Sequence, residues 1–258
     1  MQRLKKWIKK ECKETLLLFR SIPSIIVTLF ILSVVAMNLL ANKSIDLKVS
    51  WLALDCGIII SWLSFLTMDM IVKRFGAKAS IKVALFGVLV NLLISLIYIL
   101  ASNISGMWSE SFNEYGEIIN TALNNTIKGT WFVLLGSTIA FILSSTTNAL
   151  LNVGIGKFFQ KKQNSYMAYI TRSYISSCVA QFVDNLTFSL IVSLNFFGWN
   201  LTQCFMCALT GALIELLFQA FFTKIGYKIS SKWEEQEVGK EYIKLVESNN
   251  VKSIDNRN

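Results

Sequence analysis

A segment between Arg172 and Phe188 places polar side chains in a run that is otherwise apolar enough to cross a membrane. Ser177, Gln181 and Asp184 are spaced so that they lie on one face of a helix, and Arg172 lies at one end of that helix. An ionised carboxylate near the centre of a bilayer costs at least about 2.5–3.5 kcal/mol, so it normally faces a protein interior or a pathway. Asp184 is therefore the first candidate for a binding residue.

Two further acids, Asp69 and Glu215, lie in apolar runs. Carboxylates accept hydrogen bonds from adjacent N–H groups, and amides both donate and accept, so this set suits a planar molecule such as a nucleobase or a pterin-like vitamin. A buried carboxylate could also take up and release protons, as a proton-coupled carrier requires. The alternative to a binding or coupling role is that the acids form structural ion pairs, for example Asp69 with Lys73. The amides on the same or neighbouring runs are Asn38, Asn148, Gln181, Asn185 and Gln219. Aromatic rings that could stack on a flat ligand are Trp62, Phe65, Phe182, Phe188 and Phe218.

A polytopic membrane fold would place these residues inside a bundle of helices. Of the 258 residues, 53% are hydrophobic, and the mean hydropathy is +0.52. The spanning segments must be helices, because lipid offers no partner for an open backbone. We therefore predict an all-α bundle of six transmembrane helices. The apolar runs cover residues 23–41, 51–72, 82–101, 130–152, 171–197 and 201–223.

The charge distribution gives an orientation. The net charge is +9, and 22 of the 25 lysines and arginines fall at the two ends of the chain or in the second and fourth loops. Positive residues concentrate on the cytoplasmic side of membrane proteins, so we expect both termini in the cytoplasm. This pattern disfavours nucleic acid as a partner. The chain has no histidine, and we expect neither a metal nor another cofactor.

Three regions follow from these patterns. We predict a basic amphipathic segment at 1–22, lying on the anionic inner leaflet, and a six-helix domain at 23–223. A charged cytoplasmic tail at 224–258 would be disordered from 249 onward. The polar loop at 102–129 would hold a short helix or none, and Asp55, near the start of the second run, would face water.

Three motifs in order resemble the queuosine-precursor transporter family, also called the vitamin uptake transporter family. The first is Asn38-Leu-Leu-Ala-Asn-Lys, and the second is Phe65-Leu-Thr-Met-Asp-Met-Ile-Val-Lys-Arg-Phe-Gly. The third joins Arg172, Ser177, Gln181, Asp184 and Phe188, followed by Phe197-Gly198. The chain departs from the family at Asn148, where many members carry aspartate, and at Glu215, where some carry lysine.

The resemblance implies an importer of 7-deazaguanine precursors of queuosine, a modified base of transfer RNA, in the bacterial inner membrane. It would not be an enzyme, and ion-coupled secondary transport would drive it. Its substrate-binding residues would be Asp184, Gln181, Glu215, Arg172, Asn38, Asn185 and Gln219. Asp69 and Asn148 would serve coupling or gating. A substrate-capture subunit of an ATPase-driven importer and a membrane scaffold are the alternatives, and partners include the lipid bilayer, a second copy or an energy-coupling subunit.

Overall fold

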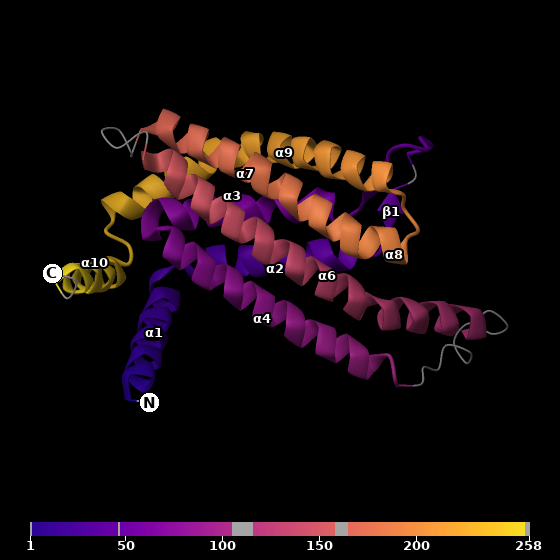
Figure 1. The fold of residues 1–258 in the computed structure, drawn as a ribbon, viewed down its shortest axis with the longest axis horizontal. Helices are drawn as coiled ribbons and strands as arrows, with labels where there is room; N and C mark the ends of the chain where they lie inside the picture. Colours follow the sequence, from indigo (N-terminus) through magenta and orange to yellow (C-terminus); the bar gives the residue numbers. More distant parts are fainter. Residues whose placement is uncertain (1, 46, 105–115, 158–164, 256–258) are drawn as a thin grey trace.

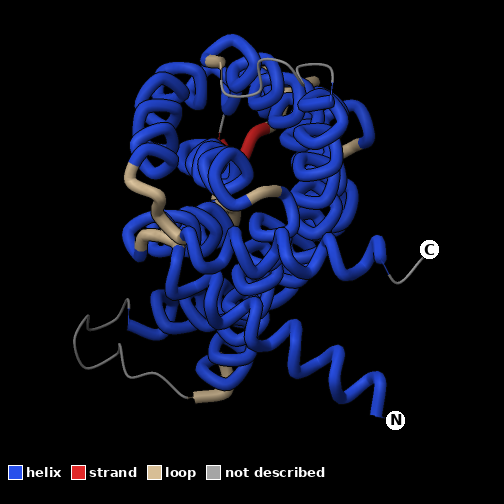
Figure 2. Tube along the Cα trace, turned by 90° about the vertical axis from the view of Figure 1, so that its left-hand side faces the viewer, coloured by secondary structure: helices blue, strands red, loops and turns tan. Residues whose placement is uncertain are grey.

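A computed structural model of the chain describes residues 2–45, 47–104, 116–157 and 165–255. Nearly all of these residues are helical, and only two short strands interrupt them (Figure 2). The main helices are α1 (Gln2–Ser21), α2 (Ser24–Leu40), α3 (Ile58–Phe75), α4 (Ala77–Ala101), α6 (Gly116–Gly156), α7 (Tyr166–Phe188), α9 (Leu201–Glu235) and α10 (Lys240–Asp255). The prediction of an all-α protein is confirmed.

The helices α2, α3, α4, α6, α7 and α9 run side by side, and α1 and α10 lie together at one end of this bundle (Figure 1). The strands β1 (Ser44–Ile45) and β2 (Leu54–Asp55) pair antiparallel near the opposite end. The most extensive helix contacts join α6 with α7 and α4, and α9 with α7 and α3. Residues of α3, α6, α7 and α9 therefore face each other inside the bundle.

Local signals in the sequence explain the main boundaries. Pro23 precedes the first turn of α2, where its missing N–H is no loss, and the chain bends by 101° between α1 and α2. Gly76 takes a φ of +84°, which separates α3 from α4 and favours glycine. Asn200 and Gln203 form a reciprocal capping box that starts α9. A π-helical turn, η3 (Ser189–Ser193), continues α7 into α8 (Leu194–Phe196).

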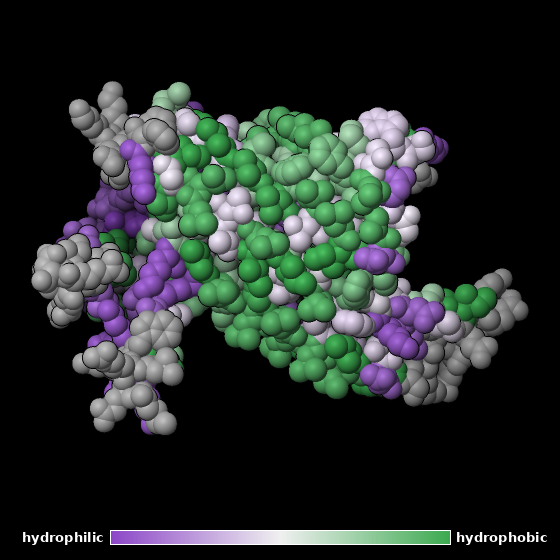
Figure 3. All heavy atoms as spheres, in the orientation of Figure 1, coloured by the Kyte–Doolittle hydropathy of each residue, from purple (hydrophilic) through white to green (hydrophobic). Residues whose placement is uncertain are grey.

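Within the described residues, four helices are long and apolar enough to cross a membrane. They are α4, the part of α6 from Thr121, α7 continued to Phe196, and α9. The bent pair of α1 and α2 adds a fifth if it counts as one span. Figure 3 shows the corresponding band of hydrophobic residues, with hydrophilic residues gathered at both ends. These helices support a multi-pass membrane protein.

Several predicted boundaries differ from the structure. The second helix begins at Ile58 rather than 51, because residues 44–45 and 54–55 form the hairpin first. The fourth begins at Gly116, so part of the predicted loop is helical, and residues 105–115 of that loop lie outside the described residues. α9 continues to Glu235 without a break at 224. α10 continues to Asp255, where disorder was expected, and residues 256–258 lie outside the described residues.

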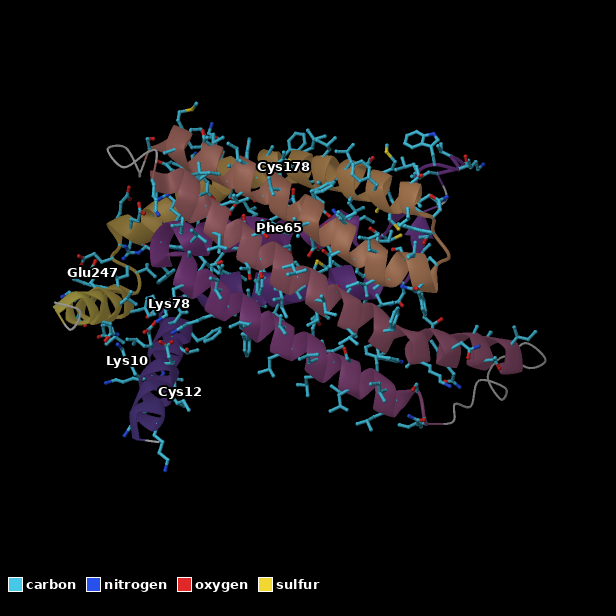
Figure 4. The ribbon with its side chains drawn as sticks, in the orientation of Figure 1. Lys10, Cys12, Phe65, Lys78, Cys178 and Glu247 are labelled. Atoms are coloured by element: carbon cyan, nitrogen blue, oxygen red, sulfur yellow. The ribbon has the colours of Figure 1, made fainter. Side chains whose placement is uncertain are left out.

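Two glutamates and two lysines join α1 to α4 at the end that carries both termini. Glu11 and Glu14 each pair with Lys78 and Lys82, at 2.8–3.0 Å. Lys78 is labelled in Figure 4, beside Lys10 and Cys12 of α1. Burial alone would raise the pKa of Glu14, but hydrogen bonds and charge attraction from the lysines outweigh it and hold this pKa below its usual range. The pairs fix the angle of α1 against the bundle.

Candidate functional site

A cavity near the hairpin gathers three carboxylates from separate elements. It lies where α2, α3, α6, α7 and α9 meet the segment that follows β1, and we call it the acid pocket. Its polar lining consists of Asn38, Asp55, Ser61, Ser137, Asp184, Asn185 and Glu215. The space open to the centre of a water-sized sphere is about 30 Å³, which is enough for water. A bicyclic base would therefore enter only if the lining moved.

Asp184 and Glu215 each have one close hydrogen-bond donor. The Ser144 hydroxyl donates to Asp184 at 2.6 Å, and the Ser61 hydroxyl donates to Glu215 at 2.5 Å. Asn185 adds a longer contact to Glu215, at 3.5 Å. Since two carboxylate oxygens offer about four acceptor positions, most of the hydrogen-bonding capacity of these acids is unused.

Asp55 is the third acid of this pocket, which corrects the expectation that it faces water. Its side chain accepts the backbone N–H of Gly57 at 2.7 Å, in the turn that leads into α3. A Cβ atom on Gly57 would lie 2.6 Å from the carbonyl oxygen of Met37, so only glycine allows α2 to approach this closely. Burial raises the pKa of Asp55 to about 7, the Gly57 N–H opposes this, and the Asp184 charge adds to it.

Asn38 adds an unused donor to the acid pocket. Its side-chain oxygen accepts a hydrogen bond from the Ser137 hydroxyl. Its Nδ2 has no partner within the described structure, although only 2% of the residue is exposed. A buried donor without a partner costs stability, so this N–H is available for an acceptor on a ligand.

A second polar group surrounds Asp69, two turns further along α3 than Ser61. The Oδ2 atom of Asp69 accepts from Ser173, from Ser177 at 3.1 Å and from Gln219 at 2.9 Å. Its Oδ1 atom accepts longer contacts of 3.4 Å from two asparagines of α6. We call this group the Asp69 cluster; its members are Asp69, Asn148, Asn152, Ser173, Ser177, Gln181 and Gln219.

The Asp69 cluster joins α3, α6, α7 and α9 through one carboxylate. Gln181 extends it toward the acid pocket, because its amide donates to Gln219 at 3.1 Å. Lys73 does not pair with Asp69 as expected, since its ammonium group lies 2.8 Å from Glu234. The charge of Arg172, which is half-buried on α7, interacts with Asp69. Asp69 is thus buried, ionic and surrounded by donors.

Comparison with protein families places most of the chain in a known family. Residues 55–229 match the family described as "Putative vitamin uptake transporter". The chain belongs to this family. No curated protein and no solved structure shows significant similarity to the chain.

The match to the vitamin uptake family includes most of the described polar groups. It begins at Asp55 and covers α3 to most of α9, so it contains all three acids of the acid pocket and the whole Asp69 cluster. Asn38 and α2 lie outside it. The pocket therefore combines residues of the matched region with a donor from a helix that precedes this region.

The structure divides the predicted binding residues into two groups. Asn38, Asp184, Asn185 and Glu215 line the acid pocket. Gln181 and Gln219 belong to the Asp69 cluster with Asn148, and Arg172 lies beside that cluster. Of the predicted aromatic rings, Phe188 lines the pocket, whereas Trp62 stacks on Phe218 and Phe222. Phe65 is buried in the middle of the bundle (Figure 4).

Sequence reasoning missed Asp55 and the serines that contact the acids. The signal for Asp55 was local, because Asp-x-Gly before a helix is a typical side-chain turn. The serines give no such signal, since small hydroxyl residues occur throughout closely packed membrane helices. In the described part of the chain no group of three or more acids or cysteines is arranged to hold a metal ion.

Proposed function

We propose that the protein imports a 7-deazaguanine precursor of queuosine across the bacterial cytoplasmic membrane. In this proposal six helices span the membrane, both termini lie in the cytoplasm, and an ion gradient drives uptake. The family match supports transport of a vitamin-like small molecule. The basic residues at the end that carries both termini support the orientation.

One observation carries the choice of ligand class. The acid pocket offers carboxylate acceptors, on Asp184 and Glu215, together with a free N–H donor on Asn38. The edge of a guanine-type ring has the complementary arrangement, a carbonyl oxygen beside two N–H groups. A carboxylate accepts such paired N–H groups well, and the amide of Asn38 would donate to the carbonyl oxygen.

The Asp69 cluster would act on the same pathway as a gate. It holds four helices together on the side of the acid pocket that faces the end with both termini. Release of a ligand toward that end would require these helices to separate. Arg172, beside Asp69, would stabilise the closed arrangement.

Uptake by the purified chain in proteoliposomes tests this function. We expect labelled 7-cyano-7-deazaguanine to accumulate with the wild type and not with Asp184→Asn. The control Glu241→Gln changes an exposed glutamate of α10 and should transport normally. Normal uptake by Asp184→Asn would contradict the role of this residue. Uptake that appears only after an ATPase partner is added would favour a substrate-capture subunit.

A further inference from the structure

The acid pocket gathers acidic side chains without a basic residue to pair with them. Its lining contains Asp55, Asp184 and Glu215, and no lysine or arginine is found among the described residues that line it. The three carboxyl groups line one small cavity, so negative charges on them would repel one another. Such a group of acids favours binding of a positive charge.

The hydrogen bonds of the pocket lead to the same conclusion. Each of the three acids has one donor closer than 3 Å, from Gly57, Ser144 and Ser61 respectively. The single carboxylate of Asp69 accepts from five side chains. Each carboxylate of the acid pocket thus has fewer hydrogen-bond donors than the carboxylate of Asp69 in the same bundle. An ammonium group brings three donors and a charge together.

A second observation favours a ligand that carries more than a positive charge. Asn38 has a buried side-chain N–H without a partner, and this residue lines the same cavity. A cation cannot accept that hydrogen bond. A ligand with an acceptor as well as a positive charge would complement both features of the pocket. The space open to the centre of a water-sized sphere, about 30 Å³, admits a group as small as an ammonium group, and the rest of the ligand would need the lining to move.

We propose that the pocket selects ligands that carry an ammonium group, which lies beside Asp55, while Asp184 and Glu215 accept hydrogen bonds from ring N–H groups and Asn38 donates to a carbonyl oxygen. This inference rests on the proposed function. Within the deazaguanine class, it assigns the 7-aminomethyl compound as the preferred ligand over the neutral 7-cyano compound. Hydrogen bonding to a guanine edge does not require Asp55. The inference therefore gives Asp55 the role of setting this preference.

Equilibrium binding of the two compounds to purified full-length protein tests the inference. We expect the wild type to bind 7-aminomethyl-7-deazaguanine at least tenfold more tightly than the 7-cyano compound. Asp55→Asn should lower this ratio to about threefold or less. Asp55→Glu, which keeps the charge, should retain a preference for the aminomethyl compound.

The outcomes separate the two proposals. Equal affinity of the wild type for both compounds would overturn the inference and leave the proposed function standing, since protons would then neutralise the acids. A preference that survives unchanged in Asp55→Asn would also overturn it. Binding of neither compound would contradict the proposed function together with the inference.

Discussion

The acid pocket and the Asp69 cluster use carboxylates in opposite ways. In the Asp69 cluster one carboxylate accepts from five side chains of three other helices. In the acid pocket three carboxylates share a small cavity, and each has one close donor. A buried carboxylate with all its donors present stabilises helix packing, whereas one that lacks donors is free to bind a ligand.

The largest effect should come from removing the charge at the Asp69 cluster. Asp69→Asn replaces an acceptor by an amide that directs N–H groups at the donors of Ser173 and Gln219. Leaving a buried donor without its acceptor costs about 1–3 kcal/mol. We therefore expect a clear fall in melting temperature in detergent. A melting temperature equal to that of the wild type would show that this carboxylate does not hold the helices together.

The matching change in the acid pocket should affect ligand binding strongly and stability little. Glu215→Gln keeps the shape of the side chain and removes one of three acids that share a small cavity, so the free energy of unfolding should change by less than about 1 kcal/mol or increase slightly. Binding of a deazaguanine should weaken more than tenfold in a titration, because an acceptor is lost. If Glu215→Gln instead destabilised the protein as much as Asp69→Asn, the distinction between the two regions would fail.

A smaller effect should follow from a methyl group at the wall of the acid pocket. Gly57→Ala places a Cβ atom 2.6 Å from the Met37 carbonyl oxygen and 2.8 Å from a carboxylate oxygen of Asp55, so the turn must shift. We expect a several-fold loss of affinity. Gly154→Ala in α6 is the matched control, since a Cβ atom there meets nothing within 4 Å, and it should bind like the wild type. Equal affinity of both variants would mean that the Met37–Asp55 wall does not contact the ligand.

The smallest effect concerns the ion pairs between α1 and α4, outside both regions. The folded protein holds the pKa of Glu11 and Glu14 below the ordinary value of 4.5. Their contribution to stability is therefore fully present above pH 4.5 and is lost as the pH falls through the lower, folded value. The wild type should lose melting temperature over this range, and Lys82→Met should lose less. Identical pH profiles would rule out these pairs as the cause.

The sequence predicted the fold better than the grouping of its polar residues. Apolar runs locate helices well, because lipid demands about 20 such residues per span, and α9 begins at the predicted residue, Leu201. Spacing along α7 placed Gln181 beside Asp184, yet these side chains contact different partners, Gln219 and Ser144. Contacts between helices depend on the rotation of each helix about its axis and on its depth in the membrane. A single sequence does not encode either quantity in a local pattern.

The direct test of the account is a thermal-shift titration of the purified protein with 7-aminomethyl-7-deazaguanine, in parallel for the wild type and Glu215→Gln. A ligand at 100 times its Kd adds about 2.7 kcal/mol to the stability of the protein that binds it. We predict a saturable increase in melting temperature for the wild type and a much smaller one for the variant at the same concentrations. No increase for the wild type, or equal increases for both proteins, would contradict the claim that the acid pocket is the substrate site.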